Sequence, residues 1–280
     1  MIPVDTQGKP VYNEIRHSDN RSEQYCSYIL DRISPDNFFA ITGNRVDSHF
    51  TLPKIIWFKQ HFTKIYKKTK YIIQSKDSIR SRLTGVHGVT DYSDASLTCA
   101  FNFKKKMWAK DMLCELGLDV NKFPQIRASH ELAGTVSADV AHITGLKEGI
   151  SVYLGGGDTA CSTRGAGIVA KGKAQLCVGS SAWISVLEEK PLVDHKRRLQ
   201  NFYGLDGYLC NVCGTVQSAA ITVGVGSGLF QNYESGAQMI SFSHSIEPNN
   251  ETYTRYKKQY EKFCRLYHPF HDLCYIMKHT

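Results

Sequence analysis

The stretch ISVYLGGGD at residues 150–158 decides how this sequence is interpreted. An apolar strand is expected over residues 150–154, and it runs into three glycines that end on the carboxylate of Asp158. Because glycine adopts backbone conformations that other residues avoid, we expect a sharp bend that holds Asp158 at the mouth of a cleft. A carboxylate in that place can serve as a general base for a bound hydroxyl group.

A second strand-and-turn unit follows in LCVGSS, residues 176–181. The amides and hydroxyls of Gly179, Ser180 and Ser181 are suited to holding phosphate oxygens. A carboxylate that faces a phosphate-binding turn is the minimum equipment for moving a phosphoryl group onto a hydroxyl. The same patterns also occur in ordinary turns with an exposed aspartate, so the residues alone leave both interpretations open.

Other segments of the chain resemble, in order, the FGGY family of carbohydrate kinases, and most closely its xylulokinases. The segment TLPKIIWFKQH at residues 51–61 is similar to the first signature of that family, apart from His49, where a small or aromatic residue is usual. TDYSDAS at residues 90–96 resembles the xylulokinase version of the next motif, and residues 131–186 resemble the middle of the family sequence. The resemblance extends over most of residues 2–220.

The resemblance implies a fold of the α/β class, namely the two-lobed ribonuclease-H-like or actin-like ATPase fold, with both lobes incomplete. Near residue 150 the sequence changes from helix-rich segments to short strands separated by glycine turns. We therefore expect a partial amino-terminal FGGY domain over residues 1–150 and a partial carboxyl-terminal FGGY domain over residues 151–280.

The resemblance has two interruptions. Residues 2–10 resemble the strand and turn that follow the family's Met-His-Gly sugar-binding motif, which occurs nowhere in the chain. Asp19 and Arg21 then match a Trp-x-Asp-x-Arg block, with His17 in place of the tryptophan. Near residue 220 the sequence passes directly to a segment similar to the family's carboxyl end. The interrupted resemblance predicts a chain truncated at the amino terminus with an internal deletion. An incomplete gene product or splice form is a further interpretation.

The resemblance also implies a function and a site. The chain would be a phosphotransferase of xylulokinase type that uses ATP and Mg²⁺ to phosphorylate an alcohol group of a ketopentose such as D-xylulose. Asp158 would be the general base and a sugar-binding residue, beside Thr159, which stands where Asn or Gln usually helps to hold the sugar. Gly179, Ser180 and Ser181 would bind phosphate or nucleotide. The eleven histidines show no metal-site spacing, so no metal-ligating residue is assigned.

A hypothesis of another class remains open. The chain could be a non-catalytic remnant or interaction protein derived from a sugar kinase, because most groups that position the substrates are missing from the resemblance. Missing strands would leave sheet edges and apolar faces uncovered. We therefore expect a marginally stable monomer that self-associates through its incomplete lobes.

Further residues have structural interpretations. Gly155, Gly156 and Gly157 are expected to serve a hinge rather than to contact a ligand. Lys54 and Trp57 are interpreted as packing residues between helices. Four polar residues within the matching blocks are interpreted as members of buried salt bridges or helix caps: Asp19, Arg21, Asp91 and Asp94.

Composition limits the class of protein. With 280 residues, 42% hydrophobic and 21% charged, the chain is typical of a globular protein. The net charge of +8 is spread over separate amphipathic segments, which does not favour a nucleic-acid surface. No apolar run is long enough to span a membrane and no signal peptide opens the chain, so a cytoplasmic location is expected. The nine cysteines, Cys210-Asn-Val-Cys213 included, are interpreted as buried reduced thiols rather than a zinc site.

Periodicity and turn residues predict the secondary structure. Helices are expected over residues 22–32 (capped by Asp19 or Ser22), 55–62, 76–83, 109–116 and 138–144. Strands are expected over residues 2–5, 11–15, 150–154, 173–178, 182–187 and 207–210.

Overall fold

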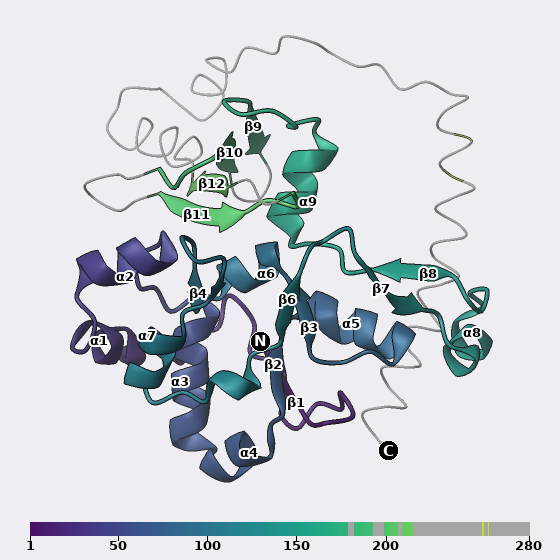
Figure 1. The fold of residues 1–280 in the computed structure, drawn as a ribbon, viewed down its shortest axis with the longest axis horizontal. Coiled ribbons are helices and arrows are strands. Elements are labelled where there is room, and N and C mark those ends of the chain that lie inside the picture. The colour runs from purple at the N-terminus through teal and green to yellow at the C-terminus, as the bar shows by residue number, and fades with distance from the viewer. Residues whose placement is uncertain (179–181, 193–198, 207–208, 215–253, 255–256, 258–280) are drawn as a thin grey trace, which may run out of the picture. The chain divides into compact units, whose positions relative to one another are not determined.

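The computed structural model describes residues 1–178, 182–192, 199–206, 209–214, 254 and 257 (Figure 1). The chain divides into two compact units. The first contains residues 1–134 and 151–215, and the second contains residues 135–150 and 216–280. The boundary predicted near residue 150 remains a prediction, and the junction predicted near residue 220 lies outside the described residues.

The first unit is built around one buried helix. This helix, α3 (Thr51–His61), begins after Phe50 and carries Pro53 in its first turn, where a missing amide proton does not interrupt the helix. Residues 51–58 are all buried. Helices α1 (Gln24–Leu30) and α4 (Thr63–Lys68) pack against it. Helices α2 (Pro35–Thr42) and α7 (Lys110–Glu115) belong to the same unit.

Short strand pairs accompany these helices. Strand β1 (Ile2–Val4) pairs antiparallel with β2 (Tyr71–Ile73), and β3 (Val89–Asp91) pairs parallel with β6 (Gln125–Arg127). Strand β4 (Phe101–Asn102) pairs antiparallel with β5 (Met107–Trp108), and β7 (Leu132–Thr135) adjoins β8 (Ser151–Tyr153). Helices α5 (Ser75–Thr84) and α6 (Tyr92–Leu97) and the 3₁₀ turn η1 (Val120–Lys122) complete this part of the unit.

A four-stranded antiparallel sheet follows along the chain. Its order is β11 (Gln200–Tyr203), β12 (Leu209–Gly214), β10 (Ala182–Glu188) and β9 (Ala174–Val178). Helix α9 (Asp158–Gly165) packs on this sheet, where the hydroxyls of Thr163 and Ser185 lie 2.8 Å apart (Figure 1).

Asn44 and Asn201 join this sheet to the helical part of the same unit, and both are fully buried. Asn44 Nδ2 donates to the Asn201 carbonyl, and the Asn201 amide donates to Asn44 Oδ1, each at 2.8 Å. Asn201 Nδ2 also donates to the carbonyl of Gly43 at 2.6 Å. Beside them, the ring of Tyr203 stacks on Phe103 with the ring centroids 5.2 Å apart. Strand β11 is therefore an internal part of the unit.

Among the described residues of the second unit, α8 (Ala138–Thr144) is a capped helix. Ser137 accepts a hydrogen bond from the Val140 amide, and Gly145 ends the helix in the left-handed conformation at φ 72°. These are the usual polar start and glycine stop of a helix.

Most predicted elements are confirmed, with two corrections. Residues 11–15 do not form a strand: a single bridge joins Val4 to Pro10, and Pro10 has no amide proton to continue the ladder. The predicted cap of α1 is also wrong. Asp19 binds Arg21 and the Ser22 hydroxyl donates to the Ser48 carbonyl, so Glu23 precedes α1 without a side-chain cap.

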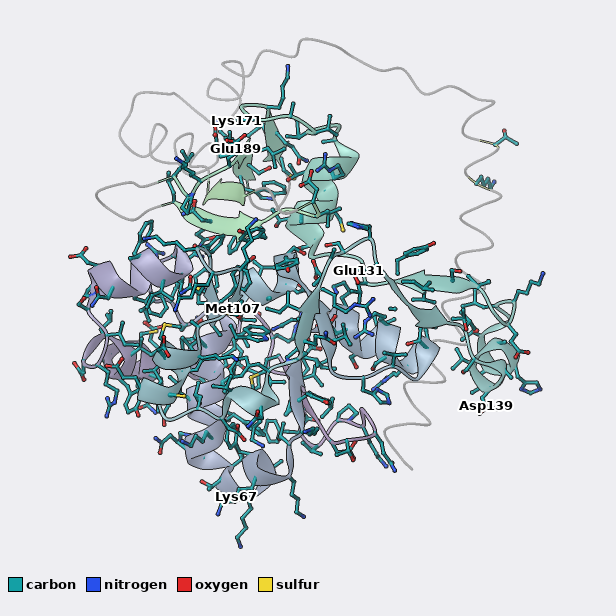
Figure 2. All side chains as sticks on the ribbon, in the orientation of Figure 1. Lys67, Met107, Glu131, Asp139, Lys171 and Glu189 are labelled. Atoms are coloured by element: carbon teal, nitrogen blue, oxygen red, sulfur yellow. The ribbon has the colours of Figure 1, made fainter. Side chains whose placement is uncertain are left out.

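The exposure of the cysteines differs in part from expectation. Charged side chains such as Lys67 on α4 extend away from the fold, and the exposed Lys171 and Glu189 pair at 3.4 Å (Figure 2). Cys99 is buried as expected, whereas Cys114 and Cys161 are exposed. Within the described part of the chain, no helix is long and apolar enough to cross a membrane.

Candidate functional site

The turn after β8 favours glycine at two positions. Gly155 has φ 69°, a conformation that side chains disfavour. A Cβ atom on Gly156 would lie 2.1 Å from Cδ2 of Leu205, so a larger residue there would require the Leu205 side chain to move. Residues 154–158 are called the glycine loop below, and Asp158 is both its last residue and the first residue of α9.

The glycine loop rests on the start of α6. Asp91 caps that helix by accepting hydrogen bonds from the amides of Ser93 (2.9 Å) and Asp94 (3.3 Å). The Gly157 amide donates to Ser93 Oγ at 2.8 Å. A Cβ atom on Gly157 would lie 3.3 Å from Asp94 Oδ1. The loop and the helix start are therefore in direct contact. The hinge expected at the three glycines does not account for this contact, and the hinge itself stays a prediction.

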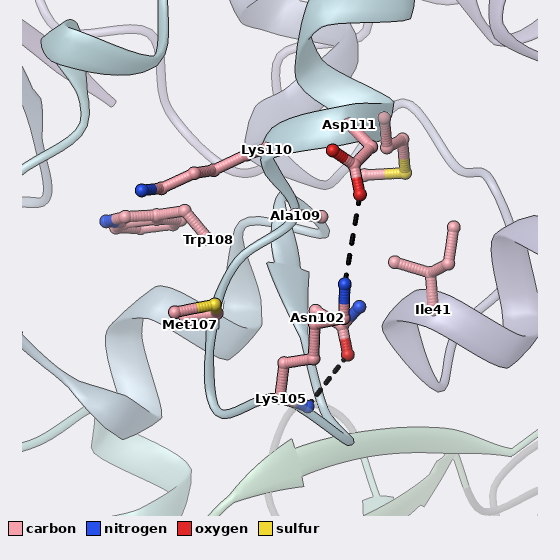
Figure 3. A pocket seen from close by; sticks show the side chains of 9 residues that line it. Ile41, Asn102, Lys105, Met107, Trp108, Ala109, Lys110 and Asp111 are labelled. Carbon is pink, nitrogen blue, oxygen red and sulfur yellow. Dashed lines mark hydrogen bonds and ion pairs between the residues drawn. The ribbon is translucent and has the colours of Figure 1, made fainter.

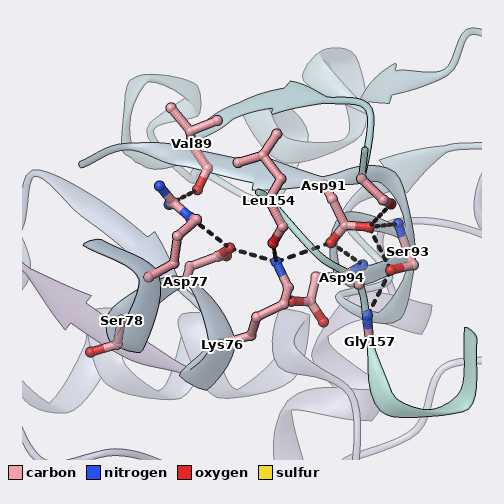
Figure 4. A network of polar contacts seen from close by, with 12 residues as sticks. Lys76, Asp77, Ser78, Val89, Asp91, Ser93, Asp94, Leu154 and Gly157 are labelled. Atoms are coloured by element: carbon pink, nitrogen blue, oxygen red, sulfur yellow. Dashed lines mark hydrogen bonds and ion pairs between the residues drawn. The ribbon is translucent and has the colours of Figure 1, made fainter. Parts of the chain in front are cut away.

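A network of buried charges lies beneath the glycine loop (Figure 4). The ammonium of Lys76 lies 2.8 Å from Asp77, 3.2 Å from Asp91 and 3.3 Å from Asp94. It also donates to the Leu154 carbonyl at 3.1 Å. With Ser93 and Ser129, these residues form what is called the polar network below. Because charges are costly to bury without partners, such a cluster is stable only when each member is paired.

The polar network shifts the ionisation of its members. Burial alone would lower the pKa of Lys76, but the carboxylates of Asp77, Asp94 and Asp91 outweigh it and raise that pKa above its usual value. Burial raises the pKa of the Asp94 carboxyl, the nearby Asp77 and Asp91 raise it further, and Lys76 opposes them. Asp94 Oδ2 has an ion pair with Lys76 but no hydrogen-bond donor.

Asp158 and Thr159 line one cavity of about 370 Å³, called the Asp158 cavity below. Its polar lining includes Asp94. Its apolar lining includes Phe50 and Phe202, whose ring centroids are 6.1 Å apart. The cavity thus combines apolar walls with several converging polar groups, and such polar groups fix the orientation of a bound small molecule.

Two imidazoles belong to the lining of the same cavity. The rings of His17 and His49 have centroids 5.2 Å apart. Burial, and next the neighbouring His49, lowers the pKa of His17. His49 pairs with Asp47 at 2.7 Å. Three positions at which the sequence departs from the family motifs, His17, His49 and Thr159, thus line the cavity that contains Asp158.

The other predicted residues are distributed as follows. Asp19 and Arg21 form a surface pair at 2.7 Å rather than a buried one. Asp91 is a helix cap, and Asp94 is part of a buried ion pair, as expected. Gly179, Ser180 and Ser181, the predicted phosphate loop, lie outside the described residues.

Lys54 and Trp57 pack within the unit, as expected. Lys54 is fully buried, and its ammonium donates to the carbonyls of His17, Ser48 and His49. Trp57 belongs to the apolar cluster, and the guanidinium of Arg21 lies 4.9 Å from its ring centroid.

Sequence reasoning missed Lys76, Ser93 and Ser129. The signal was present in part, since a polar residue such as Asp91 followed by Ser93 and Asp94 is typical of a helix start. No local sequence pattern indicated that the Lys76 side chain points toward those residues.

A second cavity lacks the features of a binding site. It has a volume of about 130 Å³ and lies between β4, β5 and α7, with Ile41, Asn102 and Trp108 in its lining (Figure 3). Its charged pair, Lys105 and Asp111, is 3.8 Å apart and largely exposed. In the described part of the chain, no group of three or more His, Cys, Asp or Glu residues could hold a metal ion.

Comparison with known proteins identifies the family. Residues 1–165 match the model of the FGGY family of carbohydrate kinases, N-terminal domain. The chain belongs to this family. It is 35% identical over 202 residues to the xylulose kinase of Bacillus subtilis, covering 72% of this chain and 40% of that relative. It is 29% identical over 254 residues to the xylulose kinase of Lactococcus lactis, covering 91% of this chain and 48% of that relative.

Solved structures of this FGGY family show the same fold. The xylulose kinase of Rhodospirillum rubrum superposes with a TM-score of 0.72 at 24% identity, over 85% of this chain and 49% of that one. The glycerol kinase of Plasmodium falciparum gives a TM-score of 0.71 at 21% identity, over 82% of this chain and 48% of that one. The fold is therefore the actin-like ATPase fold of FGGY sugar kinases, and the chain spans about half the length of these relatives.

Proposed function

We propose that this chain is a cytoplasmic carbohydrate kinase of xylulokinase type, which transfers the γ-phosphoryl group of ATP to a hydroxyl of a ketopentose such as D-xylulose. The observation that carries the proposal is the position of Asp158 and Thr159 in the lining of one cavity of about 370 Å³. Family membership and the similarity to xylulose kinases supply the reaction class and the substrate class.

In this proposal Asp158 accepts the proton of the attacking hydroxyl. Its side chain is exposed to the cavity and is hydrogen bonded by the Thr159 amide at 2.8 Å, which leaves acceptor capacity for a sugar hydroxyl. Thr159 lies beside it and can hydrogen bond a second hydroxyl. The apolar part of the cavity wall excludes water from the hydroxyl that reacts.

The described residues fit a metal that arrives with the nucleotide. Mg²⁺ in kinases is held largely by phosphate oxygens and water, with only one or two carboxylates, so a protein cluster of three ligands is not required. Asp158 is proposed as the base, so the phosphate oxygens of ATP and water would hold the metal. Mg-ATP supplies the phosphoryl group when it is bound.

The test is ADP release by the purified chain with Mg-ATP and a panel of ketopentoses and polyols. We expect release that depends on the sugar, and loss of about 10²-fold or more in Asp158→Asn, because general-base catalysis contributes about 10²–10⁴-fold. Asp139→Asn is the matched control, since Asp139 is also an exposed acid in the first turn of a short helix but lies outside the cavity. Equal release in both variants would contradict the proposal.

The alternative is a non-catalytic protein that retains the sugar-binding cavity. It corresponds to the second hypothesis from the sequence, in which groups that position the substrates are missing from the resemblance. Calorimetric titration with D-xylulose distinguishes the two functions. Binding without ADP release at any nucleotide concentration would support the alternative.

We also propose that the chain self-associates through the edge of the four-stranded sheet. Within the described residues β9 has a strand neighbour on one side only, and Leu176 on it is 50% exposed. An uncovered edge with an apolar side chain favours strand pairing between copies. Sedimentation velocity should show dimers or larger species, and Leu176→Lys should shift the distribution to monomer.

A further inference from the structure

Three successive hydrogen bonds hold the backbone of the glycine loop. The Leu154 carbonyl accepts from the Lys76 ammonium at 3.1 Å. The Gly155 amide donates to the carbonyl of Ser129 at 2.9 Å. The Gly157 amide donates to Ser93 Oγ at 2.8 Å. The last of these lies one residue before Asp158, so it acts directly on the backbone that carries the carboxylate.

All three groups are connected to one buried carboxylate, that of Asp91. Oδ2 of Asp91 accepts from Ser93 Oγ at 2.5 Å and from Ser129 Oγ at 2.8 Å, and Oδ1 lies 3.2 Å from the Lys76 ammonium. Asp91 is fully buried. Hydrogen bonds to a charged acceptor in a buried place are shorter and stronger than neutral ones, so Asp91 fixes the orientation of its three partners.

The hydrogen bond from Ser93 has a defined direction. A hydroxyl has one proton to donate, and Ser93 gives it to the Asp91 carboxylate. Its lone pairs are then directed to the Gly157 amide, which can only donate. Alanine at position 93 would remove the side-chain acceptor of that amide, and among the described residues no other hydroxyl of α6 hydrogen bonds the loop.

Asp158 itself has little that holds its side chain. Among the described residues, it accepts one hydrogen bond, from the amide of the adjacent Thr159. The place of the carboxylate in the cavity is therefore set by the backbone of the glycine loop. A displacement of about 1 Å in a reacting group costs about 10²-fold in rate.

We propose that Ser93 is a positioning residue for the base Asp158, with Asp91 orienting the Ser93 hydroxyl from behind. This inference rests on the proposed function for the role of Asp158, but the restraint on the loop does not. The path runs from Asp91 through Ser93 and Gly157 to Asp158. Ser93 does not need to touch the sugar or the nucleotide.

The experiment compares Ser93→Ala with Ser96→Ala in the full chain. Ser96 is an equally buried serine on α6, and its hydroxyl accepts from the Tyr203 amide at 2.9 Å and donates to the Ser93 carbonyl at 2.8 Å, not to the glycine loop. Hydrogen exchange of the Gly157 amide is measured in both variants. Ser93→Ala should speed that exchange about tenfold, which corresponds to about 1.4 kcal/mol, and Ser96→Ala should leave it unchanged.

Kinetics provide a readout that a purely structural role would not affect. Ser93→Ala should lower kcat for the sugar about 10–100-fold with the KM for ATP unchanged. Ser93→Thr, which keeps the hydroxyl, should recover most of that loss. Equal exchange in the two alanine variants, or fast exchange with unchanged kcat, would overturn the inference. A wild-type chain without turnover would refute the proposed function, and the exchange comparison would still decide whether Ser93 holds the loop.

Discussion

Two buried regions of the first unit, the apolar cluster around α3 and the polar network beneath the glycine loop, contain lysines with opposite surroundings. Among the described residues, Lys54, beside the apolar cluster, donates only to backbone carbonyls, and burial lowers its pKa. Lys76 faces three carboxylates, and its pKa is raised. Apolar packing is non-directional and tolerates many solutions, whereas ion pairs and hydrogen bonds fix particular atoms. The loop that carries the candidate base rests on the directional region.

The largest effect should come from removing the cation of the polar network. Lys76→Met leaves Asp77, Asp91 and Asp94 buried without their common partner, so we expect a loss of about 3–5 kcal/mol in the free energy of unfolding by urea. Lys54→Met removes hydrogen bonds to neutral carbonyls and should cost less, about 1–3 kcal/mol. Equal losses would mean that the two lysines are equivalent and that the comparison fails.

A smaller loss is expected at the junction between the helical part and the sheet. Asn201→Ala removes the side-chain amide that donates to the Gly43 carbonyl and accepts from the Leu192 amide, which should cost about 2 kcal/mol of unfolding free energy. The exposed Asn121→Ala should change it by less than about 0.5 kcal/mol. A loss at Asn201 no larger than at Asn121 would show that the junction does not contribute to stability.

The apolar cluster should tolerate a conservative change. Ile56→Val removes one buried methylene from α3 and should cost about 1 kcal/mol in urea unfolding. Exchange of the Gly157 amide should stay at the wild-type rate in this variant. Faster exchange there would mean that apolar packing also positions the loop, and would blur the distinction between the two regions.

The last prediction concerns the direction of a pH dependence rather than its size. The pKa of Asp94 is raised by burial to about 7, so the folded chain binds more protons than the unfolded chain between about pH 4 and that value. Stability contributed by protonated Asp94 is thus lost as pH rises through this window. The Tm of the wild type relative to Asp94→Asn should fall from pH 4 to 7 and stay level above it. A rise over the same window would contradict the assigned ionisation.

The glycine turn, α3, α5 and α8 could be predicted because their signals are local, whereas α2, which also ends at a glycine, was missed. Gly145 indicates a helix end, and the apolar run of α3 indicates a buried helix, each within a few residues. Asp158 could be singled out for the same reason, since it follows three glycines directly.

Helix α5 could be placed along the sequence, but its orientation could not. Periodicity assigns apolar residues to the interior. In α5 the order is reversed: Ile79 is 53% exposed, while Asp77 and Arg80 are buried. The polar network was therefore hidden, because its buried charges have the pattern of a solvated helix face.

The pairing of Asn44 with Asn201 has no local signal either, and it has a consequence for synthesis. The two residues are 157 positions apart in the chain. At about 5–20 residues per second, the ribosome adds Asn201 roughly 8–30 s after Asn44. During that interval Gly43 and Phe103 of the nascent chain lack their contacts with β11. The amino-terminal part of the unit therefore cannot complete its packing until β11 is synthesised. Chaperone contacts on the growing chain should concentrate there.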